Sequence, residues 1–163
     1  MGMARERSTA AEMMAAREHR STASISGHPL HPAVVPVPIG LLTAAAASDL
    51  AELITGDSFF ARMSRWLIGG GIVGGLLAAA LGLVDFSTIR AARGTTGIAH
   101  AGGNAAVLAI SAASLGLRQS SDRVTPVARV LTLAAAGLLA VTGWLGGELA
   151  FRERVGVVPS LDR

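Results

Sequence analysis

Cysteine, tyrosine and lysine are all missing from this chain of 163 residues, and aromatic residues make up only 4% of it. Without cysteine the chain cannot form disulfides, ligate an iron–sulfur cluster through thiolates or attach c-type haem covalently. Without tyrosine it has no phenol for acid–base catalysis. The absence of lysine makes all 14 basic residues arginine. These arginines are scattered over every polar segment instead of forming one basic stripe, so we expect no binding to nucleic acid.

Apolar sequence is abundant, since 51% of the residues are hydrophobic. They fall into four blocks, at about residues 33–54, 65–86, 97–117 and 127–150. Each block is close to the ~20 residues with which a helix crosses the hydrocarbon of a membrane. A soluble four-helix bundle would need a polar stripe on each helix, and the stretches 66–84 and 130–147 carry no charged residue. The sequence therefore predicts four membrane-spanning helices.

The connections between the blocks are short, and short connections make neighbouring helices antiparallel. We therefore predict an all-α integral membrane protein, an up-down-up-down four-helix bundle over residues 27–158. A polar N-terminal tail, 1–26, and a short C-terminal tail, 159–163, flank it. In the first tail, the spacing of Thr9 and Glu12 predicts a capping box for a short helix, and we expect no secretory signal because the tail lacks its apolar core.

Arginines near the ends of the blocks indicate which way the bundle faces. Seven of them lie on the side of the two termini, and five lie on the opposite side. Because basic residues are retained on the cytoplasmic side of a membrane, we predict that both termini face the cytoplasm, with the four helices in a bacterial inner membrane. The lipid bilayer is the first expected partner of the chain.

Glycines four residues apart recur in the second and fourth blocks. Gly70 and Gly74 form one such pair, and Gly143 and Gly147 form another. Small residues at this spacing let two helix backbones approach closely in lipid. We favour packing of these faces within the bundle over dimerisation, and a homo-oligomer stays open as the alternative.

Five polar residues fall at the same end of the four blocks. Successive spans run in opposite directions, so the start of an odd span and the end of an even span lie on one membrane face. The residues are His28 and His31 before the first block, Asp85 at the end of the second, His100 at the start of the third and Glu148 at the end of the fourth. This alignment predicts a histidine–carboxylate cluster at the cytoplasmic face.

The same residues suggest an internal repeat. The first pair of blocks starts near His31 and ends in Asp85, and the second pair starts near His100 and ends in Glu148. The bundle would then consist of two related helical hairpins.

Prolines surround the first two histidines of the cluster. His28 and His31 each precede a proline, which disfavours helical backbone in the residue before it. We therefore expect both histidines in extended backbone, with helix beginning only near Pro36 or Pro38, where proline suits a first turn. The two imidazoles are then either preorganised ligands and proton carriers, or caps of helix ends beside prolines that shape the chain.

The remaining members of the cluster also allow two interpretations. His100 and Asn104 are four residues apart and share a helix face; their small neighbours leave space for a bulky ligand, or for a neighbouring helix that accepts a hydrogen bond. Asp85 and Glu148 need partners if they lie within the bilayer. A carboxylate bonded to an imidazole would fix its tautomer, whereas a nearby arginine such as Arg152 would form an ordinary salt bridge.

Two further carboxylates, Asp49 and Glu52, lie toward the opposite end of the first block. Arg62, Arg65 and Arg129 are expected on that same side. Structural ion pairs with these arginines suffice to explain both acids, although Asp49 lies deeper in the apolar sequence than Glu52.

Four pieces of sequence, in this order, are similar to a known family. They are Gly27-His28-Pro29-Leu30-His31-Pro32 with Pro38-Ile39-Gly40-Leu41-Leu42; Asp49-Leu50 and Gly82-Leu83-Val84-Asp85; His100 with Asn104; and Gly146-Gly147-Glu148-Leu149-Ala150-Phe151-Arg152 followed by Val155-Gly156-Val157. In them the chain resembles the small bacterial membrane proteins known as domain of unknown function 2231, over about residues 25–158.

The resemblance implies a four-span membrane protein without an established activity, and some members look like companions of redox proteins. In one place the chain departs from the family. Members often carry a histidine near the closing motif, where this chain reads Arg152-Glu153-Arg154. A site that needs that histidine would be altered here.

The favoured function is a redox-associated accessory module that binds b-type haem or a transition metal. The cofactor-binding residues would be His28, His31, His100 and Asn104. A metal ion would be held by His28, His31 and His100 with Asp85 and Glu148, because imidazoles and carboxylates suit several transition metals. A membrane or peripheral redox protein would be the partner.

Other functions are weighed against this one. The first alternative is a structural or anchoring membrane subunit with no cofactor. A small transporter or proton conductor using Asp49, Asp85 and Glu148 is disfavoured, because no charge lies near the centre of the second, third or fourth block. No nucleophile elbow and no phosphate-binding glycine loop is present, so we lean against an enzyme.

Overall fold

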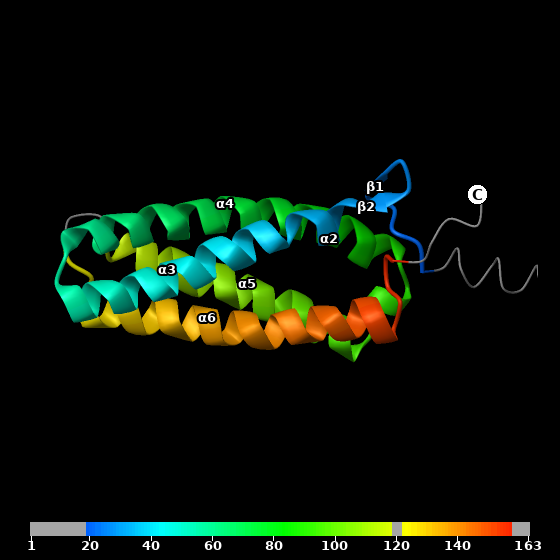
Figure 1. Ribbon diagram of the computed structural model, residues 1–163. Helices are drawn as coiled ribbons and strands as arrows, with labels where there is room; N and C mark the ends of the chain where they lie inside the picture. The colour runs from blue at the N-terminus through cyan, green and yellow to red at the C-terminus, as the bar shows by residue number, and fades with distance from the viewer. Residues whose placement is uncertain (1–18, 119–121, 158–163) are drawn as a thin grey trace, which may run out of the picture.

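The computed structural model describes residues 19–118 and 122–157, and within them the chain forms a bundle of four long spans (Figure 1). The predicted all-α architecture is confirmed, because four spans are long and apolar enough to cross a membrane. The capping box of Thr9 and Glu12 and the predicted C-terminal tail lie outside the described residues.

Each predicted block corresponds to one helical span. The elements in chain order are β1 (Ser24–Ile25), β2 (His28–Pro29), α2 (Leu30–Val34), α3 (Pro36–Thr55), α4 (Ser58–Thr88), the 3-10 helix η1 (Ala91–Arg93), α5 (Thr95–Gly116), α6 (Pro126–Gly147) and the π-helical turn η2 (Glu148–Arg152). Helix α2 continues into α3 as the first span, and α6 continues into η2 as the fourth.

Local sequence signals determine where helices end and begin at the end of the bundle opposite the histidines. Helix α3 ends at Gly56, whose φ of 68° lies in the left-handed region that glycine adopts without strain. The carboxylate of Asp57 then accepts a hydrogen bond from the backbone N–H of Phe59 and caps α4. Thr125 caps α6 in the same way, directly before Pro126.

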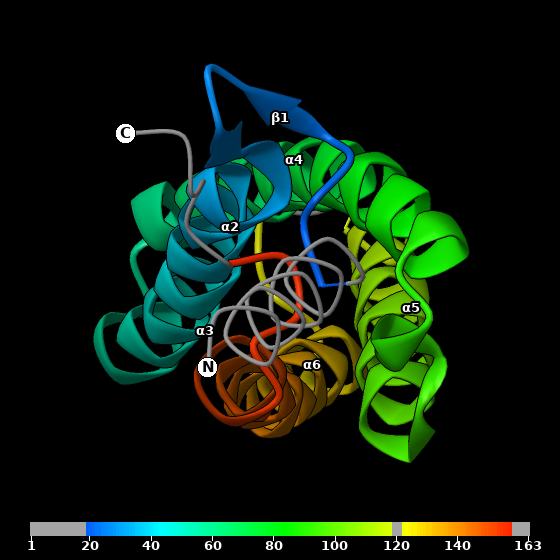
Figure 2. The same cartoon turned by 90° about the vertical axis from the view of Figure 1, so that its right-hand side faces the viewer.

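The bundle has two distinct ends. Hairpin β1–β2, the η1 loop and the turn after η2 gather at one end (Figure 1). We call it the histidine end, because it holds α2 with His31 and the first turns of α5 with His100. The connections between α3 and α4 and between α5 and α6 lie at the other, which we call the far end (Figure 1). The segments before β1 and after η2 cross the histidine end of the bundle (Figure 2).

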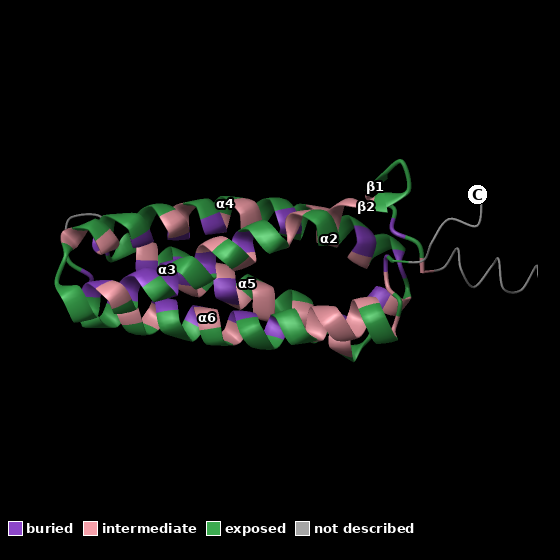
Figure 3. Ribbon diagram, viewed as in Figure 1, coloured by how far each residue is buried: buried purple, intermediate pink, exposed green. Residues whose placement is uncertain are grey.

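The outer faces of the helices are apolar. Exposed residues cover the outside of all four spans (Figure 3), and large hydrophobic side chains such as Trp66, Val73 and Leu83 are between 65% and 77% exposed. Polar side chains, in contrast, lie buried in the interior, Asp49 and Ser114 among them. This distribution suits a lipid environment, where polar groups are satisfied inside the protein.

The first span begins earlier than its prolines suggest. Ser26 and Gly27 both have positive φ, as a two-residue type I′ hairpin requires, and Ile25 pairs with His28. His28 is therefore extended, as predicted. The prediction for His31 is wrong, because it lies in the first turn of α2. Pro32 is tolerated there, since the N–H groups of a first turn have no partner within the helix.

Glycines of α4 bring the spans close together around a small apolar core. A side chain added at Gly71 would lie 2.6 Å from Leu42 of α3, and one added at Gly75 would lie 2.6 Å from Leu108 of α5. The core at this level is formed by Leu42, Val107, Ala135 and Leu139. The glycine face of α4 thus packs within the bundle, whereas Gly143 of α6 faces open space.

The two helical hairpins match in spacing and in contacts. The separation from His31 to Asp49 along the chain equals the separation from His100 to Arg118. Buried positions correspond between these segments, for example Ala45 with Ser114, which are both 0% exposed. The histidine part of the expected repeat therefore agrees with the structure. Its acidic part does not, because Asp85 is buried and Glu148 is partly exposed.

Candidate functional site

His31 is held on the second span by one hydrogen bond and one glycine. Its Nδ1 lies 2.8 Å from the carbonyl oxygen of Ala78 in α4. One turn further along α4, Gly82 leaves room for the ring, since an added Cβ would come within 2.9 Å of imidazole atoms. A carbonyl oxygen can only accept a hydrogen bond, so Nδ1 carries the proton and Nε2 keeps a free lone pair in the neutral ring.

His100 is held on the fourth span in the same way. Its Nδ1 lies 2.9 Å from the carbonyl oxygen of Thr142 in α6. Gly146, again one turn further, would bring an added Cβ within 3.0 Å of the ring. Here too Nδ1 must donate, and Nε2 is the nitrogen with a lone pair. In both helical hairpins, therefore, the histidine ring donates to a backbone carbonyl of the second helix and packs against a glycine one turn further along.

Asn104 supports the second histidine. Its amide nitrogen donates to the backbone carbonyl of His100 over 2.8 Å and also lies 3.4 Å from Nε2 of that ring. Its amide oxygen accepts from the hydroxyl of Thr142 over 3.3 Å. Asn104 therefore provides a second link between His100 in α5 and Thr142 in α6, beside the bond from the ring.

The two rings meet across the interior of the bundle. The centroids of His31 and His100 are 6.4 Å apart, and the ring planes are inclined at 88°. One ring comes from each hairpin, and both are partly buried. Of the predicted cluster, the structure thus brings together His31, His100 and Asn104.

The other predicted members have separate partners. His28 is exposed, and its Nδ1 lies 3.1 Å from the carbonyl oxygen of Ser26 in its own turn. Glu148 accepts a hydrogen bond from Arg152 over 2.8 Å, which is an ordinary salt bridge. Asp85 accepts from the N-terminal segment and from none of the histidines within the described residues.

The distribution of ligand groups bears on the kind of cofactor. No group of three or more histidine, cysteine, aspartate or glutamate side chains in the described ranges could hold a metal ion. A metal ion bound only by protein normally needs at least three such ligands. The two neighbouring imidazoles of His31 and His100 fall short of such a set, and a haem, which brings four ligands of its own to the iron, would need only two from the protein.

The far end holds a second polar site that centres on Arg118. All five N–H groups of this buried side chain have acceptors. They lie in all four spans: Asp49 accepts two of the bonds, and Ser64, Ser114, Thr132 and the backbone carbonyl of Ala128 accept the others. The network is complete and leaves the guanidinium no free donor.

A second ion pair lies beside it. Glu52 of α3 pairs with Arg129 of α6 and lies 3.8 Å from Arg123. Arg129 was among the partners expected for these acids. Arg62 instead donates to Ser58 over 2.8 Å, and Asp49 pairs with Arg118. Both acids therefore form structural ion pairs, as expected. The partner expected for Asp49 is wrong, because Arg118 was not among the arginines predicted for it.

In the sequence, Arg118 is one of the five arginines on the side opposite the termini, and its place there predicts no structural role for it. Its position at the end of the third block gives no sign of burial, because a long side chain at a helix end can reach outward as easily as inward. One signal was available: its separation from His100 equals that of Asp49 from His31. Two opposite charges at matching positions of a repeat could have suggested the pair.

Comparison with known sequences agrees with the architecture. The sequence model of one family, described as "Predicted membrane protein (DUF2231)", matches residues 27–159. No curated protein and no solved structure shows a significant similarity to the chain. The match covers both histidine hairpins and the whole four-span bundle, and it confirms the resemblance drawn from the sequence motifs. The chain therefore belongs to the DUF2231 family of predicted membrane proteins.

Proposed function

We propose that this protein is a membrane redox accessory module in which His31 and His100 would hold the iron of a b-type haem. The observation that carries the proposal is the pairing of the two rings across the bundle, with centroids 6.4 Å apart. Because metal–imidazole bonds are about 2 Å long, two histidines that held one iron would have ring centroids about 6 Å apart.

The hydrogen bonds of the two rings fit this role. Each Nδ1–H donates to a backbone carbonyl, of Ala78 for His31 and of Thr142 for His100. Metal-bound histidines are commonly oriented by such a bond, which fixes the tautomer and raises the basicity of Nε2. Neither carbonyl belongs to the helix of its histidine, so each hairpin orients its own ligand.

The residues around the two rings also support the proposal. Gly82 and Gly146 make room beside the imidazoles, and Asn104 holds the backbone of His100 to α6. A b-type haem bound here would carry one electron at a time. The chain itself would contribute the two ligands, their orientation and an apolar outer surface that keeps the site in the membrane.

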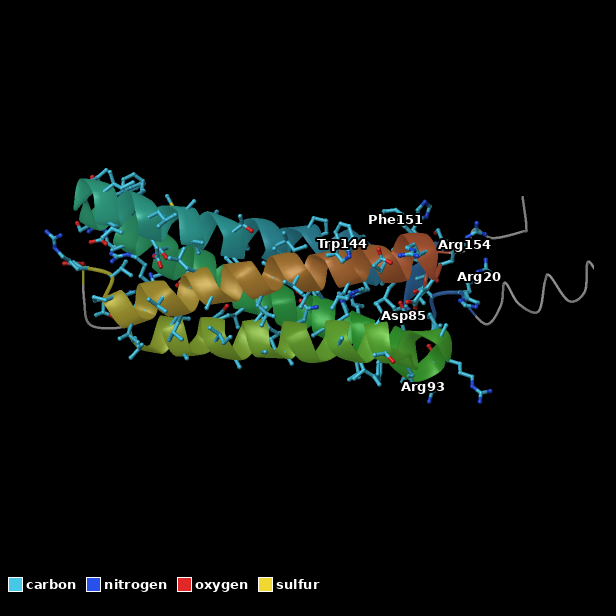
Figure 4. All side chains as sticks on the ribbon, turned by 90° about the horizontal axis from the view of Figure 1, so that it is seen from below. Arg20, Asp85, Arg93, Trp144, Phe151 and Arg154 are labelled. Atoms are coloured by element: carbon cyan, nitrogen blue, oxygen red, sulfur yellow. The ribbon has the colours of Figure 1, made fainter. Side chains whose placement is uncertain are left out.

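We further propose that the histidine end faces the cytoplasm. The side chains of Arg20, Arg90, Arg93 and Arg154 are exposed there and have no hydrogen bond or ion pair within the described part of the chain. Figure 4 shows Arg20, Arg93 and Arg154 reaching beyond the helices at this end. At the far end Arg118 and Arg129 are paired with buried carboxylates. Unpaired positive charge is thus greater at the histidine end, as the positive-inside rule requires of a cytoplasmic face.

The test is the absorption spectrum of detergent-purified protein from cells that make ample haem, before and after reduction with dithionite. We expect a Soret band and reducible α-bands of a low-spin, bis-histidine haem. His31→Ala and His100→Ala should each abolish that spectrum. His28→Ala is the matched control: it removes an exposed imidazole of the same motif and should leave the spectrum unchanged.

A colourless wild-type protein under these conditions would refute the haem assignment. The structural or anchoring subunit would then be the better proposal, with the paired histidines serving only to join the two hairpins. Loss of the spectrum in His28→Ala, with the spectrum retained in His31→Ala, would also refute the ligand assignment.

A further inference from the structure

Asp85 binds the chain segment that precedes the first span. Its Oδ1 accepts hydrogen bonds from the backbone N–H of Thr22 over 2.9 Å and of Ala23 over 3.2 Å. The hydroxyl of Ser21 lies 2.8 and 2.9 Å from the two carboxylate oxygens. This carboxylate is buried near the end of α4, and all of these partners come from the segment before β1.

The bound segment leads directly to His31. The carbonyl oxygen of Ala23 accepts the backbone N–H of Leu30, the first residue of α2, over 2.9 Å. Between them, hairpin β1–β2 closes with Ile25 paired to His28. The start of α2 is therefore fixed by hydrogen bonds that run from Asp85 through Ala23 to Leu30, and His31 is the next residue.

Helix α4 thus contacts both the ring of His31 and the chain segment that precedes it. Ala78 accepts the hydrogen bond of the His31 ring, Gly82 packs against that ring, and Asp85 lies one turn further along. Within α2 itself nothing is buried, and its N-terminus has no side-chain cap. Apart from the contacts of the ring with α4, the position of His31 therefore depends on what holds the segment before it.

We propose that Asp85 is a positioning residue for His31, which it fixes through residues 21–30. The proposal rests on the proposed function in so far as His31 is a ligand, but the link between Asp85 and His31 can be tested without a cofactor. The N-terminal segment is thereby coupled to one ligand and not to the other, since His100 is held by α6 and Asn104.

Nothing else in the described chain substitutes for this carboxylate. Thr22 and Thr88 share a hydrogen bond of 2.8 Å, which is exposed. Gly156 donates to the carbonyl oxygen of His19 over 2.8 Å and so brings the segment after η2 onto the same face. The first contact holds the side chain of Thr22 and the second holds His19. The backbone N–H groups of Thr22 and Ala23, in contrast, have only Asp85 as acceptor among the described residues.

The test measures the reactivity of individual histidines in the detergent-purified full chain. Diethyl pyrocarbonate modifies accessible imidazoles, and mass spectrometry of the digested protein resolves each site. In Asp85→Ala we expect the modification rate of His31 to rise severalfold while that of His100 stays at the wild-type value. In Asp85→Asn the modification rate of His31 should lie between the wild-type rate and the Asp85→Ala rate, because the amide keeps one acceptor oxygen and loses the second.

Glu148→Ala is the matched control, because it removes a carboxylate from the same end of the bundle that pairs only with Arg152 in the described chain. It should change neither rate. Equal rises at His31 and His100 in Asp85→Ala would mean general loosening and would overturn the proposal, as would an unchanged rate at His31.

A second readout separates this inference from the haem assignment. If the wild type carries the bis-histidine spectrum, Asp85→Ala should shift its midpoint potential or convert part of it to a high-spin form, and an unchanged spectrum and potential would overturn the positioning role. If the wild type is colourless, the haem assignment fails, and the histidine rates still decide the role of Asp85.

Discussion

Asp49 and Arg118 stand at matching positions of the two hairpins, equally far along the chain from His31 and His100, and they form a buried ion pair with each other. The far end is thus joined across the hairpins by opposite charges, and the histidine end by two imidazoles. The ion pair links α3 to the turn that follows α5, and the two imidazoles link α2 to α5. Because the charged residues follow the histidines at the same distance along each hairpin, the ion pair and the histidine pair lie at opposite ends of the bundle interior.

Loss of one partner of this ion pair should be costly. Asp49→Leu or Arg118→Leu leaves an unpaired charge in a buried site, and we expect each to lower the free energy of unfolding by about 3–5 kcal/mol. Measurement by denaturant titration of the purified protein in mixed micelles gives the values. Arg65→Leu, at an exposed position of the same end, should change the free energy by less than about 1 kcal/mol.

The double variant tests whether the effect comes from the pair. Asp49→Leu with Arg118→Leu removes both charges and should lose less stability than the two single losses summed. Some loss should remain, because Ser64, Ser114 and Thr132 would no longer share the guanidinium. Additive losses would show that Asp49 and Arg118 act independently, contrary to their contact.

The glycines beneath the histidines give a second prediction. Gly82→Ala and Gly146→Ala each add a Cβ too close to an imidazole for an undisturbed ring, at 2.9 and 3.0 Å. We expect each change to displace its ring, to weaken or shift the haem spectrum and to lower the thermal stability of the purified protein. The measurements are the reduced-minus-oxidised spectrum and the unfolding temperature.

Two other glycines of the same helices are the controls. Gly69 of α4 and Gly143 of α6 have no atom within 4 Å of an added Cβ. Replacing either by alanine should leave the spectrum unchanged and stabilise the helix by up to about 1 kcal/mol. If Gly143→Ala disturbed the spectrum as much as Gly146→Ala did, contact with the ring would not be the cause.

Much of this arrangement is legible in the sequence. Apolar blocks of spanning length predict the four helices, and their alternating direction places His31 and His100 at one end. That reasoning locates the polar side chains by depth along the membrane but not by the direction in which they point. His28 and Glu148 lie toward the same end of the bundle as His31 and His100, and the structure gives them separate local partners.

Two features escape sequence reasoning for physical reasons. The partners of Asp85 include the backbone N–H groups of Thr22 and Ala23, and a backbone donor has no sequence signature. The start of α2 at Leu30 is also not predicted from the sequence. Proline disfavours helix in the residue before it, but that rule does not hold in the first turn of a helix.

The proposed orientation can be tested with single cysteines because the chain has none of its own. Ile25→Cys places a thiol on the exposed hairpin at the histidine end, and Asp122→Cys places one on an exposed residue of the far end. A membrane-impermeant maleimide should label Asp122→Cys in intact spheroplasts and leave Ile25→Cys unlabelled. In inverted membrane vesicles the pattern should reverse, because the opposite face is then outside. Labelling of Ile25→Cys in intact spheroplasts would place the unpaired arginines on the outer face and contradict the proposed orientation.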